Sequence, residues 1–431
     1  MTFARRTRPG TSRVLLMLVM TGVLLACGAS SVAPRSPGPF PQSAASVGES
    51  NVRYSPGLVP TLTASGRAAS ALTDLLTTAV RDRLSAELLR LRAAHHLPGV
   101  QVVVRLPDGE SWDAHAGFAD VATRSAVSTT TLFDTGSITK TFVAALTLQL
   151  ASQGLLALDD PVTRWLPTFS AGRSVTIREL LDHTSGIGEP FDSRALLGRL
   201  AANPDRAWTP AAVLRYATPP AFAPGHGWLY SNANYLLLGQ IIQAATGWPA
   251  AALLQQRFFG PLGLAHTFLQ GQAPAPTSDP VAHGYEAARD TTWTATDVTG
   301  ASRYLPFRSL ATALGTAGAL VSTADDLSRW AEALYGGRVL SPTAMAQMLD
   351  FGSTSALRPR WPYGLGVQRL MLGGQTSWGH SGLLSGYHAA MRYFPATGAV
   401  IVVLVNADAT IPDALVSGLL RALGPLPPAA R

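Results

Sequence analysis

The chain has 431 residues, of which 47% are hydrophobic and 14% are charged, enough to bury a large core and build one unit of two subdomains. The formal net charge is +7. Four of the 33 basic residues lie in the first 26 positions, where no acidic residue occurs, so the rest of the chain has 29 basic and 26 acidic residues, a balance of +3. This small surplus, without a dense basic stripe, excludes a typical nucleic-acid-binding surface.

The first 26 residues have the pattern of an export signal. Residues 14–26 form an apolar run of 13 residues, too short to span a bilayer comfortably, and it follows a positive segment formed by Arg5, Arg6, Arg8 and Arg13. The ending LLAC resembles a bacterial lipobox, in which cleavage precedes a cysteine that is then lipidated. We therefore expect a lipoprotein signal peptide at 1–26. Lipidated Cys27 would then anchor the exported protein to the cell membrane, facing the extracellular or periplasmic side. The alternatives are an ordinary cleaved signal or an uncleaved anchor.

Cys27 is also the only cysteine in the chain, which excludes internal disulfides and a cysteine-based zinc cluster. Residues 27–68 are rich in Ser, Pro, Gly and Ala without periodic apolar spacing, which predicts a flexible tether. The segment 71–97 then has helical spacing and stops before Pro98-Gly99. Residues 99–120 are typical of two strands joined by a turn.

Helical patterns dominate residues 137–259, and residues 271–280 are expected to form a loop. Strand patterns return at 363–370, 386–395 and 398–408, before a final helix at 411–423. The simplest architecture for this order is an α+β fold. An antiparallel sheet would be assembled from both ends and flanked by helices, with a mainly helical subdomain inserted between them. We assign residues 69–425 to this domain.

The only lysine of the chain, Lys140, lies three residues after Ser137. Apolar residues at steps of four (Ile138, Phe142, Leu146 and Leu150) predict a buried helix, with Ser137 at its N-terminus and Lys140 on the same face. Arginine is essentially never deprotonated, whereas a desolvated lysine can lose its proton and serve as a base. The pair therefore indicates a serine nucleophile beside its base. The alternative is a capping serine with a surface lysine.

Two further stretches carry polar residues beside apolar elements. Tyr230 and Asn232, with one residue between them, precede an apolar helix, and His380-Ser381-Gly382 lie beside a predicted strand. The order Ser-x-x-Lys, Tyr-x-Asn, His-x-Gly resembles the three motifs of the serine β-lactamase and penicillin-binding protein superfamily. The likeness is greatest to the class C β-lactamase and D-alanyl-D-alanine carboxypeptidase branch. It covers about residues 80–425 and includes LLDHTSGI at 180–187.

The resemblance implies a role for each matching residue. Ser137 would be acylated, Lys140 would accept its proton or tune the neighbouring base, and Tyr230 would act as acid and base if nearby positive charge lowers its pKa. Asn232 would bind the amide of the acyl side chain. Substrate would also be bound by His380, Ser381 and Gly382, with His380 recognising a carboxylate in a pH-dependent way. The backbone N–H groups of Ser137 and Leu383 would form an oxyanion hole.

These roles imply a serine acyl-transfer hydrolase that acts on a small-molecule or peptide substrate. A D-alanyl-D-alanine carboxypeptidase or a β-lactamase is favoured, and an esterase of the same fold is the runner-up. A catalytically silent penicillin-binding or cell-wall sensor module is the alternative from another class. The sequence has no H-E-x-x-H, P-loop or G-x-S-x-G motif, and we expect no metal, no organic cofactor and no nucleic-acid partner.

Overall fold

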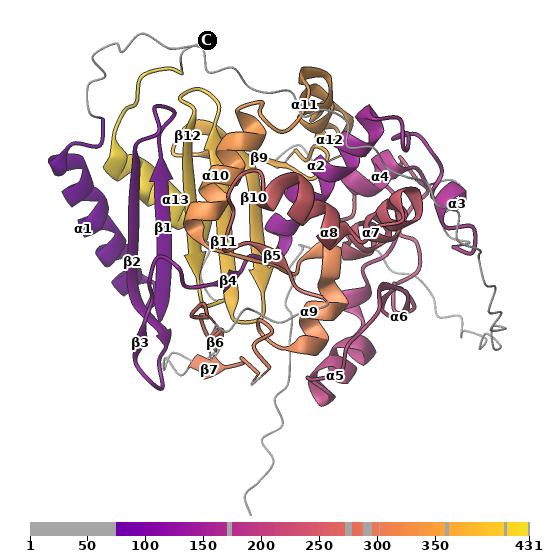
Figure 1. Cartoon of the computed structure of the whole chain (residues 1–431), viewed down its shortest axis with the longest axis horizontal. Coiled ribbons are helices and arrows are strands. Elements are labelled where there is room, and N and C mark those ends of the chain that lie inside the picture. Colours follow the sequence, from indigo (N-terminus) through magenta and orange to yellow (C-terminus); the bar gives the residue numbers. More distant parts are fainter. Residues whose placement is uncertain are drawn as a thin grey trace, which may run out of the picture. The chain divides into compact units, whose positions relative to one another are not determined.

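Strands from both ends of the catalytic region assemble into one antiparallel sheet of seven strands (Figure 1). In spatial order the strands are β3 (Ser125–Ala126), β2 (Ser111–Asp120), β1 (Gly99–Arg105), β12 (Ala399–Val405), β11 (Tyr387–Phe394), β10 (Gln375–Leu384) and β9 (Gln368–Leu372). β1 pairs with β12, with Val100 opposite Val405. The predicted α+β architecture, with its sheet built from both ends, is confirmed.

The computed structural model describes residues 75–169, 175–271, 278–287, 295–300, 302–357, 362–408 and 412–429. The predicted signal peptide (1–26), the lipidation at Cys27 and the tether (27–68) lie outside the described residues and stay predictions. Most of the loop predicted at 271–280 lies outside them as well.

Two helices from opposite ends of the domain, α1 (Thr78–Ala94) and α13 (Pro412–Leu423), pack together on one face of the sheet. α10 (Ala324–Tyr335) packs on the other face (Figure 1). Side chains of a strand alternate between faces, so Val102 and Val403 join the core beneath α1 and α13, whereas Val103 and Val402 join the larger core on the α10 side. Burial on both faces explains why β12 is a continuous apolar run.

The centre of the chain is helical, as predicted. It contains α2 (Thr139–Ser152), α3 (Val162–Trp165), α4 (Ile177–Asp182), α5 (Arg194–Ala202), α6 (Pro210–Leu214), α7 (Asn232–Thr246), α8 (Ala250–Leu254) and the π-helix η4 (Gln255–Phe259), with short 3₁₀ turns η1 (Gly136–Ile138) and η3 (Pro190–Asp192). The predicted apolar stripe of α2 is fully buried, with Ile138, Phe142, Leu146 and Leu150 each 0% exposed. Later helical elements are α9 (Arg308–Leu314), η5 (Gly315–Ala317), α11 (Pro342–Met348) and α12 (Gly352–Ser355).

Besides β3, five short strands escaped the sequence analysis because two or three residues are too few to show a period. They form a small sheet in the order β4 (Phe133–Asp134), β8 (Leu320–Ser322), β5 (Phe268–Leu269), and a hairpin of β6 (Tyr285–Ala287) with β7 (Ala295–Asp297). β8 pairs with β4, which directly precedes Ser137. The small sheet therefore fixes the approach of the chain to the predicted nucleophile.

One long strand, β10, was not predicted, because its residues 375–384 lie between the strands predicted at 363–370 and 386–395. His380, Ser381 and Gly382 lie within β10 rather than beside a strand. Two glycines weaken the strand pattern of this segment, and pairing with β11 along residues 378–384 overrides that weakness. β9 pairs only with residues 375–379, so residues 380–384 extend past the end of β9.

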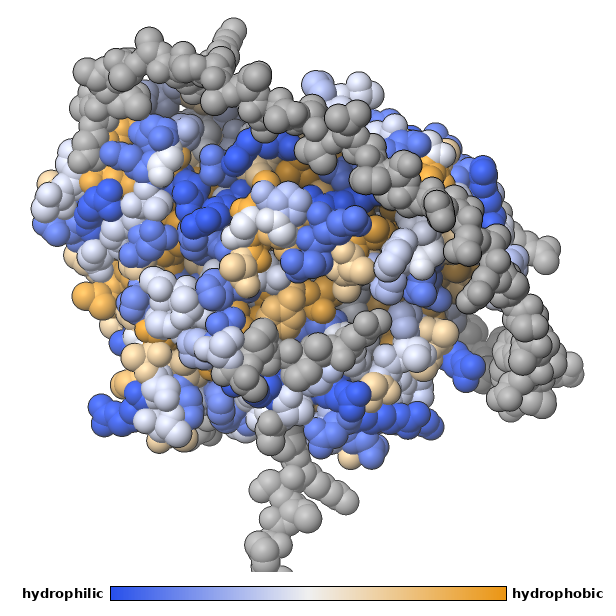
Figure 2. All heavy atoms as spheres, viewed as in Figure 1, coloured by the Kyte–Doolittle hydropathy of each residue, from blue (hydrophilic) through white to orange (hydrophobic). Residues whose placement is uncertain are grey.

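Among the described residues, no single helix has the length and apolar character needed to cross a membrane, although the bent pair α7 with α8–η4 passes by length and composition. Large apolar side chains at the surface are scattered, the most exposed being Trp248 and Met371. Figure 2 shows hydrophilic and hydrophobic residues interspersed over the visible face.

Candidate active site

Ser137 lies in the turn η1, immediately before α2. The carboxylate of Asp134 fixes this turn, because its Oδ1 accepts a hydrogen bond of 2.7 Å from the N–H of Gly136. Gly136 has φ +51, a conformation that favours glycine. The hydroxyl of Thr139 donates to the Gly136 carbonyl at 2.6 Å. The turn thus presents Ser137 on a rigid support.

The amine of Lys140 lies beside the Ser137 hydroxyl, buried and away from solvent. Its side chain is 0% exposed, and Nζ lies 3.0 Å from Ser137 Oγ, 2.8 Å from Asn232 Oδ1 and 2.6 Å from the Ala317 carbonyl oxygen. Burial lowers the pKa of Lys140 to about 7, against the opposing effect of the Glu189 carboxylate. A large fraction of the amine is therefore uncharged at neutral pH, in contact with the hydroxyl that it would deprotonate.

Tyr230 contributes an aromatic wall to the same centre. The Lys140 Nζ lies 4.8 Å from the centroid of the Tyr230 ring, close enough for a cation–π interaction when the amine is protonated. The Tyr230 ring lies 4.3 Å from that of His183 and 6.2 Å from that of His380. The structure therefore brings together all three predicted catalytic residues and the strand that carries His380.

His183 was missed as a site residue, although it lies in the segment 180–187 that carries part of the family resemblance. It ends α4 with φ +66, and its Nδ1 accepts from the Ser231 N–H at 3.2 Å and lies 3.0 Å from Asn234 Nδ2. These contacts fix the segment that positions Tyr230. No sequence spacing links residue 183 to residue 230, so only the fold could reveal this.

Asn232 lies between Lys140 and a buried carboxylate, and its predicted contact with the acyl side-chain amide stays a prediction. Its Oδ1 accepts from Lys140, its Nδ2 donates to Glu189 at 3.3 Å, and its backbone N–H donates to Glu189 at 2.5 Å. The carboxamide therefore links two buried titratable groups of the protein, the Lys140 amine and the Glu189 carboxyl group. Glu189 was also missed, because it belongs to none of the motif spacings.

His380 is 1% exposed and contacts protein groups through both ring nitrogens. Nδ1 lies 2.6 Å from the Ser381 carbonyl oxygen, and Nε2 lies 2.9 Å from Tyr363 Oη. A carbonyl oxygen can only accept, so Nδ1 carries a proton, and Tyr363 Oη is the hydrogen-bond partner of Nε2. The structure therefore engages both ring nitrogens of His380 with protein groups.

The hydroxyl of Ser381, a residue expected to bind substrate, is directed into a buried polar network. It donates to Asp413 Oδ2 at 2.6 Å and also contacts the guanidinium of Arg392, which in turn lies 2.7 Å from Asp413 Oδ1. Alternation along β10 sends Ser381 to the α13 face of the sheet, opposite to its two neighbours. The side chain of Ser381 therefore supports β10, and substrate binding at this position stays a prediction.

Gly382 and Leu383 lie against the nucleophile turn. A Cβ on Gly382 would lie 1.9 Å from the Thr135 carbonyl oxygen, and a Cβ on Gly136 would lie 2.8 Å from the Leu383 nitrogen. Gly382 therefore allows β10 to approach the backbone of the turn. The Leu383 nitrogen therefore lies beside Gly136, the residue before Ser137, and the oxyanion hole stays a prediction.

Alanine at Gly382 is expected to lower kcat/KM by about 10²-fold, because the strand and the turn must separate to admit the methyl group. Steady-state kinetics with a reactive acyl donor would measure this loss. Gly198→Ala on α5 is the matched control, since a Cβ there meets nothing within 4 Å. Full activity in Gly382→Ala would show that the close approach is dispensable.

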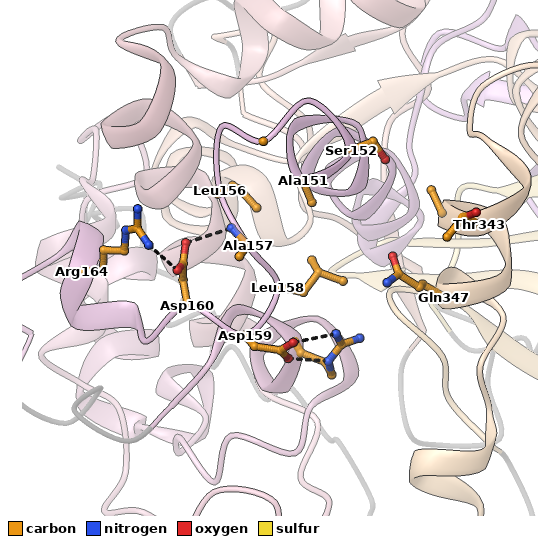
Figure 3. Close-up of a pocket in the computed structure, with 13 residues that line it drawn as sticks. Ala151, Ser152, Leu156, Ala157, Leu158, Asp159, Asp160, Arg164, Thr343 and Gln347 are labelled. Carbon is orange, nitrogen blue, oxygen red and sulfur yellow. Dashed lines mark hydrogen bonds and ion pairs between the residues drawn. The ribbon is translucent and has the colours of Figure 1, made fainter.

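A pocket of about 580 Å³ opens at the other end of α2, where Ser152 ends the helix (Figure 3). Its charged side chains are already paired, Arg164 with Asp160 at 2.7 Å and Arg178 with Asp159 at 2.9 Å. None of the predicted site residues lines it.

Within the described ranges, one group of side chains has the spacing of metal ligands: Asp120, His283 and Asp297. His283 Nδ1 lies 2.8 Å from Asp297 Oδ2, and hydrogen bonding to Asp297 raises the pKa of His283. The ion pair between His283 and Asp297 explains why these two side chains lie together, and Asp120 accepts a hydrogen bond from the Thr123 hydroxyl.

Comparison with known proteins matches the chain to a family. The Beta-lactamase family model covers residues 78–424. Penicillin-binding protein 4 of Amycolatopsis lactamdurans is 28% identical over 342 residues, covering 73% of this chain and 82% of that protein. Penicillin-binding protein 4* of Bacillus subtilis is 31% identical over 228 residues, covering 51% of this chain, and the match spans 48% of that protein's own length.

Among solved structures, the D-amino acid amidase of Ochrobactrum anthropi SV3, complexed with L-phenylalanine amide, is similar with a TM-score of 0.68 and 27% identity. The match covers 81% of this chain and 99% of that one. The sequence, fold and family model agree along the whole region that carries Ser137, Lys140 and Tyr230. The chain belongs to the Beta-lactamase family and is a serine hydrolase of the β-lactamase and penicillin-binding-protein fold.

Proposed function

We propose that this protein hydrolyses amide bonds next to D-configured residues through an acyl-enzyme on Ser137, with D-alanyl peptides as the first substrate class to test. The observation that carries the proposal is the buried Lys140 amine, 3.0 Å from Ser137 Oγ and with a pKa near neutrality. The names of two relatives, a penicillin-binding protein and a D-amino acid amidase, support amides of D-residues over simple esters.

The proposed reaction begins when Ser137 Oγ attacks the carbonyl carbon and its proton passes to neutral Lys140. The oxyanion of the tetrahedral intermediate accepts from the N–H groups of Ser137 and Leu383. Tyr230 gives a proton to the leaving nitrogen as the C–N bond breaks, and Lys140 returns its proton to Tyr230. Water then attacks the acyl-serine and loses a proton to the same pair of groups, which frees a carboxylic acid and restores Ser137.

The edge of β10 supports a peptide-like substrate. Residues 380–384 extend past the end of β9, and such an edge can pair with the backbone of an extended chain. The rings of Tyr230, Trp228 and Tyr363 lie about 6 Å apart, centroid to centroid, beside this segment. Backbone pairing with an aromatic wall would orient a planar amide in front of Ser137.

A panel of acyl donors would test the proposal: D-alanyl and L-alanyl amides, a D-alanyl-D-alanine peptide, a fluorescent penicillin and a nitrophenyl ester. Release of amine with D over L preference, together with an acyl adduct on Ser137 seen by mass spectrometry, is expected. Ser137→Ala should lose both signals. Hydrolysis of the ester alone would replace the proposal with the esterase alternative. If no donor forms an adduct, the enzyme proposal is wrong, and the catalytically silent sensor module is the remaining hypothesis.

We also propose that Cys27 is lipidated and holds the exported protein at the outer side of the cell membrane, where cell-wall peptides are accessible. Full-length Cys27→Ala is expected to move from the membrane fraction to the soluble fraction and to lose the acyl mass. An unchanged membrane fraction in Cys27→Ala would rule out anchoring through this residue.

A further inference from the structure

A buried carboxylate, that of Glu189, lies close to the catalytic amine in the loop after α4. Glu189 is 5% exposed. Its Oε1 accepts from the Phe191 N–H at 2.9 Å and from Asn232 Nδ2 at 3.3 Å, and its Oε2 accepts from the Asn232 N–H at 2.5 Å. Three N–H donors directed at two oxygens suit an ionised carboxylate, which is an acceptor only. Burial raises the pKa of Glu189, and these donors and Lys140 oppose that rise.

Asn232 connects this carboxylate to the base. The Glu189 oxygens hold the amide nitrogen and the backbone of Asn232, and the Asn232 oxygen accepts from Lys140 Nζ at 2.8 Å. Glu189 therefore fixes both the position and the orientation of the asparagine, with Oδ1 toward the lysine. Because all three side chains are at least 95% buried, their electrostatic interactions are weakly screened by solvent.

We propose that Glu189 is a positioning residue that sets the basicity of Lys140, through Asn232 and through its own negative charge. The inference rests on the proposed function, since it gives Glu189 a part in the same acylation step. When Lys140 takes the proton of Ser137, an ammonium forms in a buried site. The Glu189 carboxylate stabilises that ammonium, and without it the amine would be a weaker base.

Among the described residues, Glu189 is the neighbouring charge that raises the pKa of Lys140, and the other titratable groups nearby are directed elsewhere or face the amine with a ring. Tyr230 and Tyr235 present ring faces at 4.8 and 5.3 Å, and burial raises the pKa of Tyr235 well above its usual value. From α4, His183 packs on Tyr230, and Asp182 is turned to Thr184 at 2.6 Å. From the β10 side, His380 bonds to Tyr363.

Because Lys140 is the only lysine of the chain, its titration can be observed directly. Protein labelled with ¹³C at the lysine ε-carbon, made without lysine in any tag, gives a single lysine resonance. Its chemical shift against pH reports the pKa of Lys140 in the folded protein, whether or not any substrate is known. The same labelled protein serves for the pH dependence of kcat/KM.

Glu189→Gln keeps the shape and the acceptor oxygen but removes the charge. The Lys140 pKa is expected to fall by about one unit from its wild-type value, and the acid limb of kcat/KM is expected to move to lower pH by the same amount. At pH values above the acid limb, kcat/KM reaches a plateau. The plateau value should fall about tenfold in this variant, which corresponds to one pKa unit of lost basicity. Glu189→Asp keeps the negative charge but moves it, because the side chain is shorter. The Lys140 pKa in this variant should lie between those of Glu189→Gln and the wild type.

Asp326→Asn is the matched control. Asp326 is a buried acid that accepts from the His266 N–H and the Thr267 hydroxyl, each at 2.8 Å, and this variant should leave the Lys140 resonance and the pH profile unchanged. A Lys140 pKa that is unchanged or higher in folded Glu189→Gln would overturn the inference, and so would an equal shift in Asp326→Asn. If Glu189→Gln fails to fold, the same comparison is made with Glu189→Asp, where an unchanged pKa and pH profile count against it.

The two proposals fail in different ways. A lower Lys140 pKa in Glu189→Gln, without hydrolysis of any donor by wild-type protein, would refute the proposed function while supporting the electrostatic link. Hydrolysis by wild-type protein with an identical acid limb and plateau in Glu189→Gln would support the function and refute the part given to Glu189.

Discussion

Arginine in place of Lys140 is expected to lower kcat/KM by about 10²- to 10⁴-fold, the usual contribution of a general base. Arginine preserves the positive charge, but its guanidinium does not release a proton in the working pH range. Ser137 would then lack a group to receive its proton. Rapid-mixing measurement of acyl-enzyme formation locates the loss in acylation rather than in substrate binding.

The fully buried site of Lys140 leaves little room for a larger side chain, so a second variant is needed. Lys140→Met has similar length, no charge and no proton-accepting nitrogen. Both variants should lose acylation while circular dichroism shows a folded chain. Acylation within tenfold of wild type in Lys140→Arg would contradict the assignment of Lys140 as the base.

Alanine in place of Asp413 is expected to destabilise the fold by about 3–5 kcal/mol, because it leaves the buried charge of Arg392 without its partner. Arg392 is 0% exposed, and its Nε lies 2.7 Å from Asp413 Oδ1. Burial would raise the pKa of Asp413, but the neighbouring Arg392 charge holds it below its ordinary value. The carboxylate is therefore ionised at neutral pH, and its contribution to stability is lost only as the pH falls through its pKa in the folded protein.

Urea unfolding at pH 7 would measure this loss. The control is Asp159→Ala, since the Asp159 side chain is 76% exposed in its pair with Arg178 and such surface pairs contribute at most about 1 kcal/mol. Adding Arg392→Met to Asp413→Ala should recover part of the stability by removing the unpaired charge. A loss below 1 kcal/mol in Asp413→Ala would show that the network behind β10 is not a stability determinant.

The Arg392–Asp413 network also bears on the site, through Ser381. Gln368 Oε1 accepts from Arg392 at 2.8 Å and from the Ser381 N–H at 3.1 Å. The network therefore holds the backbone of β10 between His380 and Gly382. A sequence motif counts these three positions as one unit, whereas the alternation of the strand divides them between two faces of the sheet.

Much of the fold follows from local patterns. The short, continuous valine-rich runs of β1 and β12 are typical of strands buried on both faces. The apolar residues at steps of four along α2 are typical of a buried helix. The spacing of three residues between Ser137 and Lys140 puts both on one face of a helical turn, and the structure has them in contact.

Local patterns could not reveal the groups that reach the site from elsewhere in the chain. Glu189 meets Asn232 across 43 residues, and His183 meets Ser231 across 48. Asp134 supports the turn from only two residues before Gly136, but its role depends on full burial, which no local pattern gives. The direction of the Ser381 hydroxyl depends on the register of β10 with β11.

The sequence by itself determined the helix that joins nucleophile and base, most of the strands at both ends and the order of the three motifs, because these depend on residues a few positions apart. Only the tertiary structure decided how basic Lys140 is and what holds it. Desolvation and a neighbouring charge act through space, and the groups that supply them come from segments that become neighbours only when the chain has folded.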